Sequence, residues 1–342
     1  MGLHPSVAAV RRGVRRDLAD LPAGATVLVA CSGGPDSMAL LAAAVFEGHR
    51  AGLRVVGASV DHGLQAGSAE VTARVVQQMA RLGADETISA RVQVEGAGLG
   101  PEAAARRARY AVLEQMATHL GAAAVLLGHT RDDQAETVLL GLARGSGGRS
   151  LAGMRRRFDS YRRPLLDVTR DDTVTACQVE GIEVWHDPHN DDPGYARVRV
   201  RRSVLPVLED QLGPGVAATL ARTADQLRVD MDLLDDLAEQ AYADLVPGRP
   251  ADGPADGLAV DALAALPDAV RRRVLRLAAL AAGSPSSELF HDHVLALDAL
   301  VTGWRGQKWV DLPGHVRGTR AAGLLRVAAL RPDDGPPDAA QA

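Results

Sequence analysis

The sequence contains almost no lysine: Lys308 is the only one, and the other 37 of its 38 Lys and Arg residues are arginines. A Walker A nucleotide-binding loop needs a lysine directly after its glycine-rich turn, and a Schiff-base enzyme needs one in a pocket. Lys308 lies late in the chain, in a Trp-Arg-Gly-Gln-Lys-Trp stretch, and suits neither role. The composition therefore argues against both classes of enzyme.

Cysteine is also scarce, because Cys31 and Cys177 are the only two and form no CxxC pair. This argues against a disulfide scaffold, a thiolate zinc site and a cysteine-held iron–sulfur cluster. The longest plainly apolar run, residues 38–46, is half the length of a membrane span. The arginines near the N-terminus are not followed by the apolar core of a signal peptide. We therefore expect a soluble cytoplasmic protein with no membrane partner.

The first half of the chain alternates short β-like runs with helical stretches. The predicted strands are residues 26–31, 54–60, 87–94, 123–127 and 183–185. The predicted helices are residues 38–45, 68–82, 101–119 and 132–143, with one more beginning at a capping box formed by Thr169 and Asp172. This alternation predicts an α/β fold, with a parallel sheet covered by helices on both faces.

The pattern changes after Pro206, where helical periodicity dominates. We predict helices over residues 216–245, 258–282 and 286–302, and a short hairpin within 308–330 around Pro313-Gly314. The expected organisation is an N-terminal helix (1–24), an α/β domain (25–207), a mainly helical domain (208–330) and a disordered tail (331–342). The tail is rich in Pro, Asp and Ala.

A candidate ligand-binding loop, Ser32-Gly33-Gly34-Pro35-Asp36-Ser37, follows the first predicted strand. The glycines let backbone N–H groups approach an anion, and the following helix adds its N-terminal partial charge. Ser32 and Ser37 can donate hydroxyl hydrogen bonds to phosphate. The Asp36 carboxylate would repel phosphate unless Mg²⁺ bridges the two. The loop alone is equally consistent with a phosphate site and with a glycine turn in which Asp36 caps the helix.

The loop resembles the SGGxDS motif of the PP-loop ATP pyrophosphatase family, which needs no Walker lysine. Members of that family split ATP between the α and β phosphates and release pyrophosphate. The resemblance implies that residues 32–37 bind ATP and hold the departing pyrophosphate.

Four further stretches narrow the resemblance. They are Val60-Asp61-His62-Gly63-Leu64, Ala104-Ala105-Arg106-Arg107-Ala108-Arg109-Tyr110, the run Leu127 to Thr137, and Asp187-Pro188 with Asn190 followed by Tyr195 to Arg201 and Leu205-Pro206. Together with the loop they resemble the tRNA(Ile)-lysidine synthetase family over roughly residues 25–210. The resemblance implies that residues 25–207 form a PP-loop ATP-binding catalytic domain and that the helical domain at 208–330 binds tRNA. The sequence departs from the family pattern at Gln65, where arginine is usual, and at Val198, where asparagine is usual.

The resemblance implies ATP-dependent ligation of lysine to C2 of the wobble cytidine, position 34, of the CAU-anticodon tRNA(Ile). The reaction passes through an adenylated cytidine, yields lysidine, AMP and pyrophosphate, and changes decoding from AUG to AUA. The implied partners are ATP, Mg²⁺ at Asp36, L-lysine and the tRNA, and a homodimer is left open. The alternatives are another PP-loop tRNA-modifying enzyme such as a thiolase, an amide-forming synthetase, or a nucleotide-binding sensor without chemistry.

The resemblance also assigns residue roles. Asp133 and Glu136 are spaced to share one helical face, so they could bind the lysine amine, although an acidic first turn also complements the helix dipole. The predicted catalytic residues are Asp36, Arg109, Asp133 and Glu136. The resemblance implies that Arg109 stabilises charge on ATP or on the activated intermediate. His62 and His129 each follow a predicted strand and could bind ribose or phosphate of ATP, or could cap the strand end.

Arginine clusters supply independent support for a nucleic-acid partner. Residues 144–166 contain seven arginines against Asp159, and four more follow within 197–202. Arginine forks suit phosphate oxygens. The predicted tRNA contacts are Arg144, Arg149, Arg155, Arg163, Arg197 and Arg201. Solvated loops of a chain that scarcely uses lysine would also be rich in arginine, so this alternative stays open.

Overall fold

The computed structural model describes residues 2–61, 67–92, 101–145, 147–246 and 257–330. It divides into two compact units. Unit 1 comprises Met1–Gly145 and Ser150–Asp225, and unit 2 comprises Ser146–Arg149 and Gln226–Ala342. Each unit has its own buried core and is described by itself. Among the described residues, no helix is both long and apolar enough to cross a membrane.

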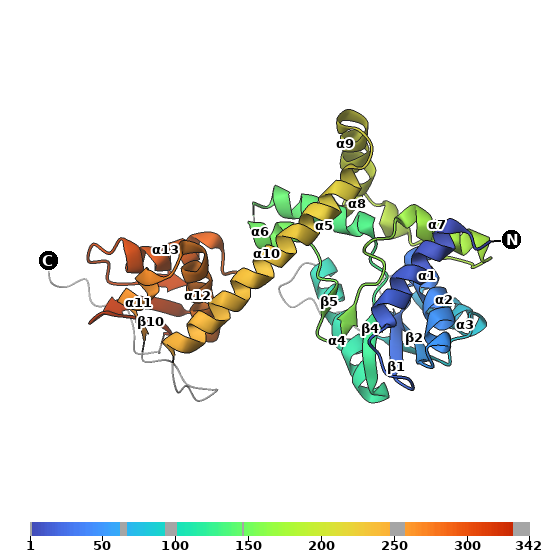
Figure 1. Cartoon of the computed structure of the whole chain (residues 1–342), viewed down its shortest axis with the longest axis horizontal. Helices are drawn as coiled ribbons and strands as arrows, with labels where there is room; N and C mark the ends of the chain where they lie inside the picture. The colour runs from blue at the N-terminus through green and yellow to red at the C-terminus, as the bar shows by residue number, and fades with distance from the viewer. Residues whose placement is uncertain (1, 62–66, 93–100, 146, 247–256, 331–342) are drawn as a thin grey trace. The chain divides into compact units, whose positions relative to one another are not determined.

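Unit 1 is built on a six-stranded sheet with the strand order β3-β2-β1-β4-β6-β5 (Figure 1). The strands are β1 (Thr26–Ala30), β2 (Arg54–Asp61), β3 (Glu86–Arg91), β4 (Ala122–Leu126), β5 (Arg157–Phe158) and β6 (Tyr161–Arg162). All neighbours pair in parallel except β5 and β6, which form an antiparallel hairpin at one edge. The sequence prediction of a parallel sheet, including its first four strands, is therefore confirmed.

The prediction of a strand at residues 183–185 is wrong. This segment has no regular secondary structure, and the backbone N–H of Trp185 donates instead to the carbonyl of Gly33, at 2.8 Å. The exposed side chains of Glu183 and Val184 have no sheet face to cover. Residues 183–185 therefore pack on the Gly33 loop and do not form an edge strand of the sheet.

Helices cover both faces of this sheet. One face carries α1 (Pro5–Leu18), α2 (Pro35–Arg50), α3 (Ser68–Arg81) and α7 (Arg170–Val179), and the other carries α4 (Pro101–Leu120). Side chains of β1 alternate between the two cores: Val27 and Val29 join the first, and Leu28 joins the second. These alternating, fully buried valines and leucines are the reason that the run folds as a central strand.

The position of β1 defines where a ligand can bind. It lies between β2 and β4, and the chain leaves it first toward β2 and β3 and later returns on its other side as β4. The helices α2 and α5 (Arg131–Ala143) therefore begin next to each other at the carboxyl edge of the sheet. Open α/β sheets bind ligands at such a switch point.

The rest of unit 1 is mainly helical. It includes η1 (Pro188–Asp191), α8 (Ala196–Arg199), the π-helical turn η2 (Val200–Val204) and α9 (Leu205–Leu212), while α6 (Gly148–Leu151) and α10 (Val216–Leu245) connect the two units along the chain. Val198, the position at which the family usually has asparagine, does not lie in a turn. Val198 lies inside α8 and is 7% exposed, so it packs in the interior.

Unit 2 combines helices with an antiparallel sheet. Its helices are α11 (Val260–Ala265), α12 (Asp268–Ala281), α13 (His291–Thr302) and the end of α10, and its sheet has the order β7-β10-β9-β8. The strands are β7 (Leu258–Ala259), β8 (Val310–Leu312), β9 (Val316–Ala321) and β10 (Leu324–Ala329). The predicted hairpin around Pro313-Gly314 is confirmed as β8 and β9.

The predicted single helix over 258–282 is interrupted. Its first residues form β7, and Pro267 separates α11 from α12 because proline has no N–H to continue the helical ladder. The core beneath these elements is centred on Leu263, Leu275 and Leu297, each 0% exposed.

Candidate active site

A cavity of about 810 Å³ opens at the carboxyl edge of the unit 1 sheet. This volume lies within the usual range of small-ligand sites, roughly 300–1,000 Å³. All the residues that line it belong to unit 1. The predicted site residues among them are Ser32, Gly34, Pro35, Asp36, Ser37, Arg109, His129, Asp133, Arg197 and Arg201. The fold thus brings together most of the residues that the sequence predicts for catalysis and ATP binding.

The loop from Ser32 to Ser37 is held in one conformation by its own side chains. The Ser37 hydroxyl donates to the carbonyl of Gly34, at 2.9 Å, and accepts from the backbone N–H of Ser32, at 3.2 Å. Gly33 has a φ of +87°, and a Cβ there would lie 2.6 Å from Val75 Cγ2, so only glycine fits. The loop therefore presents a pre-organised turn at the N-terminus of α2, a common arrangement for phosphate binding.

A second glycine lets the loop after β4 approach this turn. A Cβ on Gly128 would lie 3.1 Å from backbone atoms of Asp36 and Ser37. The absence of a side chain at Gly128 thus places His129 and the start of α5 directly against the phosphate-type loop.

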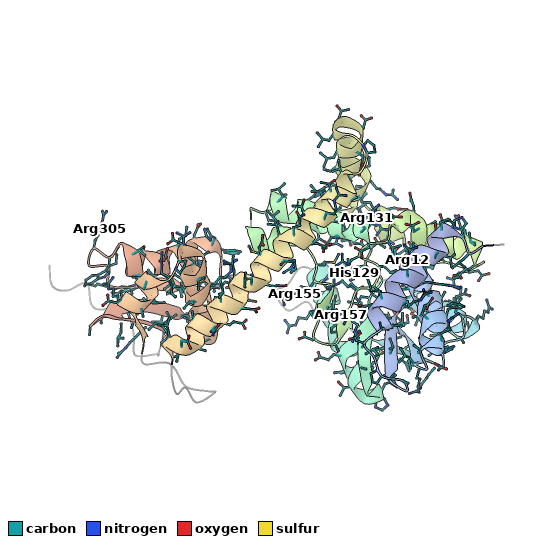
Figure 2. All side chains as sticks on the ribbon, viewed as in Figure 1. Arg12, His129, Arg131, Arg155, Arg157 and Arg305 are labelled. Carbon is teal, nitrogen blue, oxygen red and sulfur yellow. The ribbon has the colours of Figure 1, made fainter. Side chains whose placement is uncertain are left out.

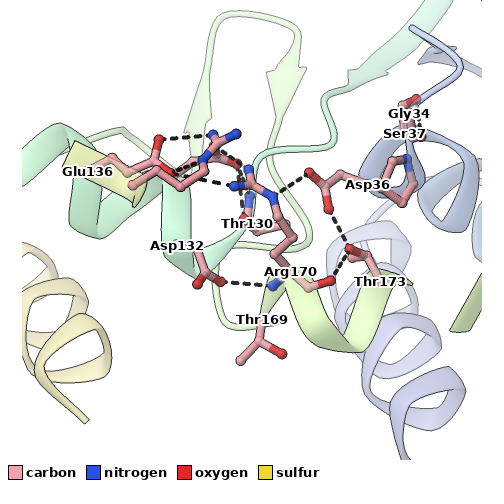
Figure 3. A network of polar contacts seen from close by, with 12 residues as sticks. Gly34, Asp36, Ser37, Thr130, Asp132, Glu136, Thr169, Arg170 and Thr173 are labelled. Carbon is pink, nitrogen blue, oxygen red and sulfur yellow. Dashed lines mark hydrogen bonds and ion pairs between the residues drawn. The ribbon is translucent and has the colours of Figure 1, made fainter. Parts of the chain in front are cut away.

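Asp36 points from the loop toward α7 (Figure 3). Its carboxylate contacts Arg170 Nε at 3.3 Å and accepts a hydrogen bond from the Thr173 hydroxyl. Burial raises the pKa of Asp36, and the charge of Arg170 opposes this rise. Asp36 is thus a half-buried carboxylate beside the loop, held by one guanidinium and one hydroxyl.

Arg170 connects this carboxylate to two others (Figure 3). Its guanidinium lies 2.9 Å from Asp133 Oδ1 and 3.5 Å from Glu136 Oε1, and its backbone N–H donates to Asp132 at 2.8 Å. Burial alone would lower the pKa of Arg170, but the four surrounding carboxylates, Asp133 foremost, raise it above its ordinary value. The sequence analysis missed Arg170, because its partners lie 34 to 134 residues away and no local pattern links them.

Asp133 and Glu136 lie on one face of α5, as their spacing predicts, and are 7% and 0% exposed. Arg201 donates to both Glu136 oxygens, at 2.6 and 3.1 Å, and Arg197 lies 3.9 Å from the same carboxylate. Burial would raise the pKa of Asp133, but the nearby charges, Arg170 foremost, lower it. Asp133 also accepts from the backbone N–H of Thr130, so it caps the helix as well.

A balanced cluster of charges lies at the wall of the pocket. Glu136, which is 0% exposed, belongs to this cluster but is not among the residues that line the cavity. Three carboxylates, Asp36, Asp133 and Glu136, face three guanidinium groups, Arg170, Arg197 and Arg201. An incoming ammonium group can exchange with a guanidinium, and an incoming phosphate can exchange with a carboxylate. The arrangement suits a reaction that brings together an anionic nucleotide and a cationic amine.

Arg109 and His129 complete the wall of the cavity. Burial lowers the pKa of the Arg109 guanidinium, which lines the pocket from α4. Burial also lowers the pKa of the half-buried His129 to about 3, and its Nδ1 accepts from Arg163 Nε at 3.3 Å. His129 is therefore a neutral imidazole at physiological pH. His62 lies outside the described residues, although Asp61 beside it ends β2 and lines the same pocket.

The arginines predicted to contact tRNA divide into two groups. Arg144, Arg149 and Arg155 are exposed, and Figure 2 labels Arg155 at the surface of unit 1. Arg163 is 6% exposed and donates to the carbonyl of Arg155, so it belongs to the interior rather than to a phosphate-binding surface. Arg197 and Arg201 face the pocket carboxylates instead of open solvent.

Much of the charge predicted for residues 144–166 is neutralised within the fold. Arg156 pairs with Asp167 and Asp225, and the hairpin arginines Arg157 and Arg162 pair with Asp20. Local composition could not show this, because Asp20 and Asp225 are remote in sequence and Asp167 lies just outside the segment.

Comparison with known proteins places this geometry in context. Residues 10–208 match the model of the PP-loop domain, and residues 258–328 match that of the TilS substrate binding domain. A tRNA(Ile)-lysidine synthase of Thermobifida fusca is 57% identical over 330 residues, covering 96% of this chain and 99% of the relative. One from Streptomyces coelicolor is 51% identical, covering 95% and 99%.

A solved structure with a similar fold is the U34-tRNA thiolase NcsA from Methanococcus maripaludis with its [4Fe-4S] cluster. It superimposes with a TM-score of 0.56 at 17% identity and covers 65% of this chain and 80% of the thiolase. At this identity the likeness concerns the fold alone.

Proposed function

Because this chain belongs to the tRNA(Ile)-lysidine synthase family, we propose the following roles for the residues of its pocket. The activity is the ATP-dependent formation of lysidine in tRNA(Ile), a ligase reaction. The observation that carries the proposal is the contact of one guanidinium, that of Arg170, with both the loop carboxylate Asp36 and the α5 carboxylates Asp133 and Glu136. One cavity thus joins a nucleotide-type loop to a site for an amine.

In the first step ATP lies with its phosphates on residues 32–37. The C2 oxygen of cytidine 34 attacks the α-phosphorus, the bond to the β-phosphate oxygen breaks, and pyrophosphate leaves. The backbone N–H groups at the start of α2 and the guanidinium of Arg109 stabilise the negative charge that develops on the phosphates. The wobble base must leave its stack to reach this edge of the sheet.

Asp36 fits a role as a magnesium ligand by its chemistry. Mg²⁺ is usually held by one or two carboxylates together with substrate phosphates and water. Asp36 is a half-buried carboxylate at the phosphate-type loop, and no group of three or more metal-binding side chains occurs among the described residues. When bound, the ion would neutralise phosphate charge, and Arg170 and Thr173 would hold the carboxylate in place.

In the second step the side-chain amine of lysine attacks C2 of the adenylated cytidine, the C2–O bond breaks, and AMP leaves. We assign Asp133 and Glu136 to the lysine ammonium group, which would exchange with Arg197 or Arg201 at these carboxylates. A freed carboxylate then accepts the proton that the amine must lose to become a nucleophile.

The tRNA itself would extend beyond this cavity. We propose that the exposed Arg144, Arg149 and Arg155 contact its phosphates, and that the region after residue 208 binds its body. Such an enzyme would work in the cytoplasm, where its tRNA is found. The homodimer remains a prediction for gel filtration to test.

The deciding experiment gives the purified protein ATP, labelled lysine and the CAU-anticodon tRNA(Ile). We expect pyrophosphate only when the tRNA is present, and label in the tRNA only when lysine is present. Chelation of Mg²⁺ by EDTA should stop pyrophosphate release. Release of pyrophosphate regardless of tRNA would contradict the proposal.

Two variants separate the steps. Asp36→Asn should reduce pyrophosphate release by about 100-fold, because a pre-organised charge contact at the phosphates is lost. Glu136→Gln should leave adenylated tRNA forming while lysine transfer falls by a similar factor. Glu183→Gln is the matched control, because the Glu183 side chain is 85% exposed and outside the pocket.

A further inference from the structure

Unit 2 contains a basic and aromatic surface that the catalytic pocket does not use. Residues 303–330 contain five cationic side chains against Asp311, whereas the whole chain has a formal net charge of -5. The only lysine and two of the three tryptophans lie in this stretch. We call the following set the 304–309 patch: three exposed residues, Trp304, Arg305 and Lys308, together with three half-buried neighbours, Trp309, Arg317 and Arg320.

Each tryptophan of the patch is paired with an arginine. The guanidinium carbon of Arg320 lies 4.8 Å from the ring centre of Trp304, and that of Arg317 lies 4.7 Å from the ring centre of Trp309. Arg320 also donates to the carbonyl of Leu300, at 2.8 Å, which anchors it to the end of α13. The Trp304 ring nevertheless remains 47% exposed.

The loop that carries these groups is held by its own hydrogen bonds. Trp304 Nε1 donates to the carbonyl of Gln307, at 3.0 Å, and the backbone N–H of Arg305 donates to Gln307 Oε1, at 2.6 Å. Lys308 and Arg305 remain exposed, and Figure 2 shows Arg305 extending outward from unit 2. A loop that its own hydrogen bonds already hold, and that presents an exposed ring beside exposed cations, loses little entropy on binding.

From this arrangement we propose that the 304–309 patch binds an unpaired nucleotide of the tRNA, with its base on Trp304 and neighbouring phosphates at Arg305 and Lys308. The inference rests on the proposed function, because it takes the tRNA as the partner. An aromatic ring can stack only on a base that is not enclosed in a duplex, and single-stranded loops and ends supply such bases. No patch residue lines the catalytic cavity, so this contact is separate from cytidine 34.

The first test measures the affinity for tRNA(Ile) by filter binding. Trp304→Ala should weaken binding by about 5- to 100-fold, the usual effect of removing one stacking partner. Trp304→Phe keeps a ring and should recover most of the affinity. The control is Phe290→Ala, which removes another exposed aromatic ring at the opposite end of the twelve-residue α13, roughly 18 Å away.

The second test measures the salt dependence of binding. The double variant Arg305→Gln with Lys308→Gln should reduce the slope of log Kd against log salt concentration by about 1.5, because two phosphate contacts are lost. Titration with a short single-stranded RNA should quench tryptophan fluorescence of the wild type more than that of Trp304→Ala, while blunt duplex RNA should not separate them.

The outcomes distinguish this inference from the proposed function. Unchanged affinity in Trp304→Ala and an unchanged salt slope in the double variant would overturn the patch while leaving lysidine formation intact. A wild-type protein that binds tRNA through the patch but forms no lysidine would contradict the proposed function alone. Thermal unfolding checks that each variant folds. If Trp304→Ala does not fold, the double variant at the exposed Arg305 and Lys308 still tests the inference.

Discussion

The charged side chains of the cluster at the pocket wall are stable in the folded protein only because they pair with one another. Each of the carboxylates Asp36, Asp133 and Glu136 would be costly to bury as an isolated anion. Arg170 is the one residue in the described part of the chain whose guanidinium lies within ion-pair distance of all three. Removing one partner of a buried pair usually costs about 3–5 kcal/mol, because the remaining charge keeps its desolvation penalty.

Arg170→Met should therefore lower the free energy of unfolding of unit 1 by about 3 kcal/mol, measured by urea denaturation. It should also raise KM for lysine, because unpaired carboxylates hold their geometry less well. Arg170→Lys should recover only part of both effects, since an ammonium group cannot bridge three carboxylates as a planar fork does.

Arg107→Met is the control for this prediction. Arg107 is an exposed arginine of α4, where a substitution should change stability by less than about 0.5 kcal/mol. Equal stability of Arg170→Met and Arg107→Met would show that Arg170 does not organise the cluster.

At the scale of elements, the β5–β6 hairpin is attached to the segment after α1 by ion pairs. Asp20 contacts Arg157 at 3.0 Å and Arg162 at 2.7 Å. The hydrogen bond from Arg162 contributes most to lowering the pKa of Asp20, from an ordinary 3.8 to about 2. A carboxylate with a lowered pKa in the folded state stabilises that state above its unfolded pKa and loses this contribution as the pH falls toward 2.

Asp20→Asn should therefore lower the melting temperature at pH 6 and have less effect as the pH falls from about 4 toward 2. The Asp20 side chain is 51% exposed, so solvent screening keeps the effect below about 1 kcal/mol, or a few degrees. Calorimetry of both proteins across this pH range measures it. A difference in melting temperature that is the same at pH 6 and near pH 2 would contradict the assignment.

At the scale of the whole molecule, the two units have separate cores. The buried cluster around Leu263, Leu275 and Leu297 lies in unit 2, whereas the clusters on the two faces of the parallel sheet lie in unit 1. Leu297 is fully buried, and Gly318 leaves room for it: a Cβ there would lie 2.3 Å from Leu297 Cδ2. A substitution in the core of one unit, or a ligand bound to one unit, should therefore change the stability of that unit alone.

Leu297→Ala should lower the stability of unit 2 by about 2–5 kcal/mol through lost burial and a new cavity. Saturating ATP should instead raise the free energy of unfolding of unit 1, by about 2.7 kcal/mol at an ATP concentration of 100 times its Kd. Differential scanning calorimetry with and without ATP separates these effects. Leu233→Ala, at a 59% exposed leucine of α10, is the control. If ATP and Leu297→Ala shifted the same transition, the units would not unfold independently.

Local sequence patterns were sufficient wherever structure depends on near neighbours. Apolar runs predicted four adjacent parallel strands of the sheet, β1 to β4, and the Ser32–Ser37 loop was predicted as a turn at a helix start. The spacing of Asp133 and Glu136 placed both on one face of α5. The tail at 331–342 and His62 lie outside the described residues, so those two predictions stand as they were.

The sequence by itself thus determined the α/β class, the phosphate-type loop and the carboxylate pair, because strand alternation, glycine turns and helical spacing are local properties of the chain. Only the tertiary structure decided which charges meet. It placed Arg170 against Asp36, Asp133 and Glu136, directed Arg197 and Arg201 into the pocket, and buried Arg163. The physical reason is that ion pairing depends on distance in space, and these partners are up to 134 residues apart along the chain.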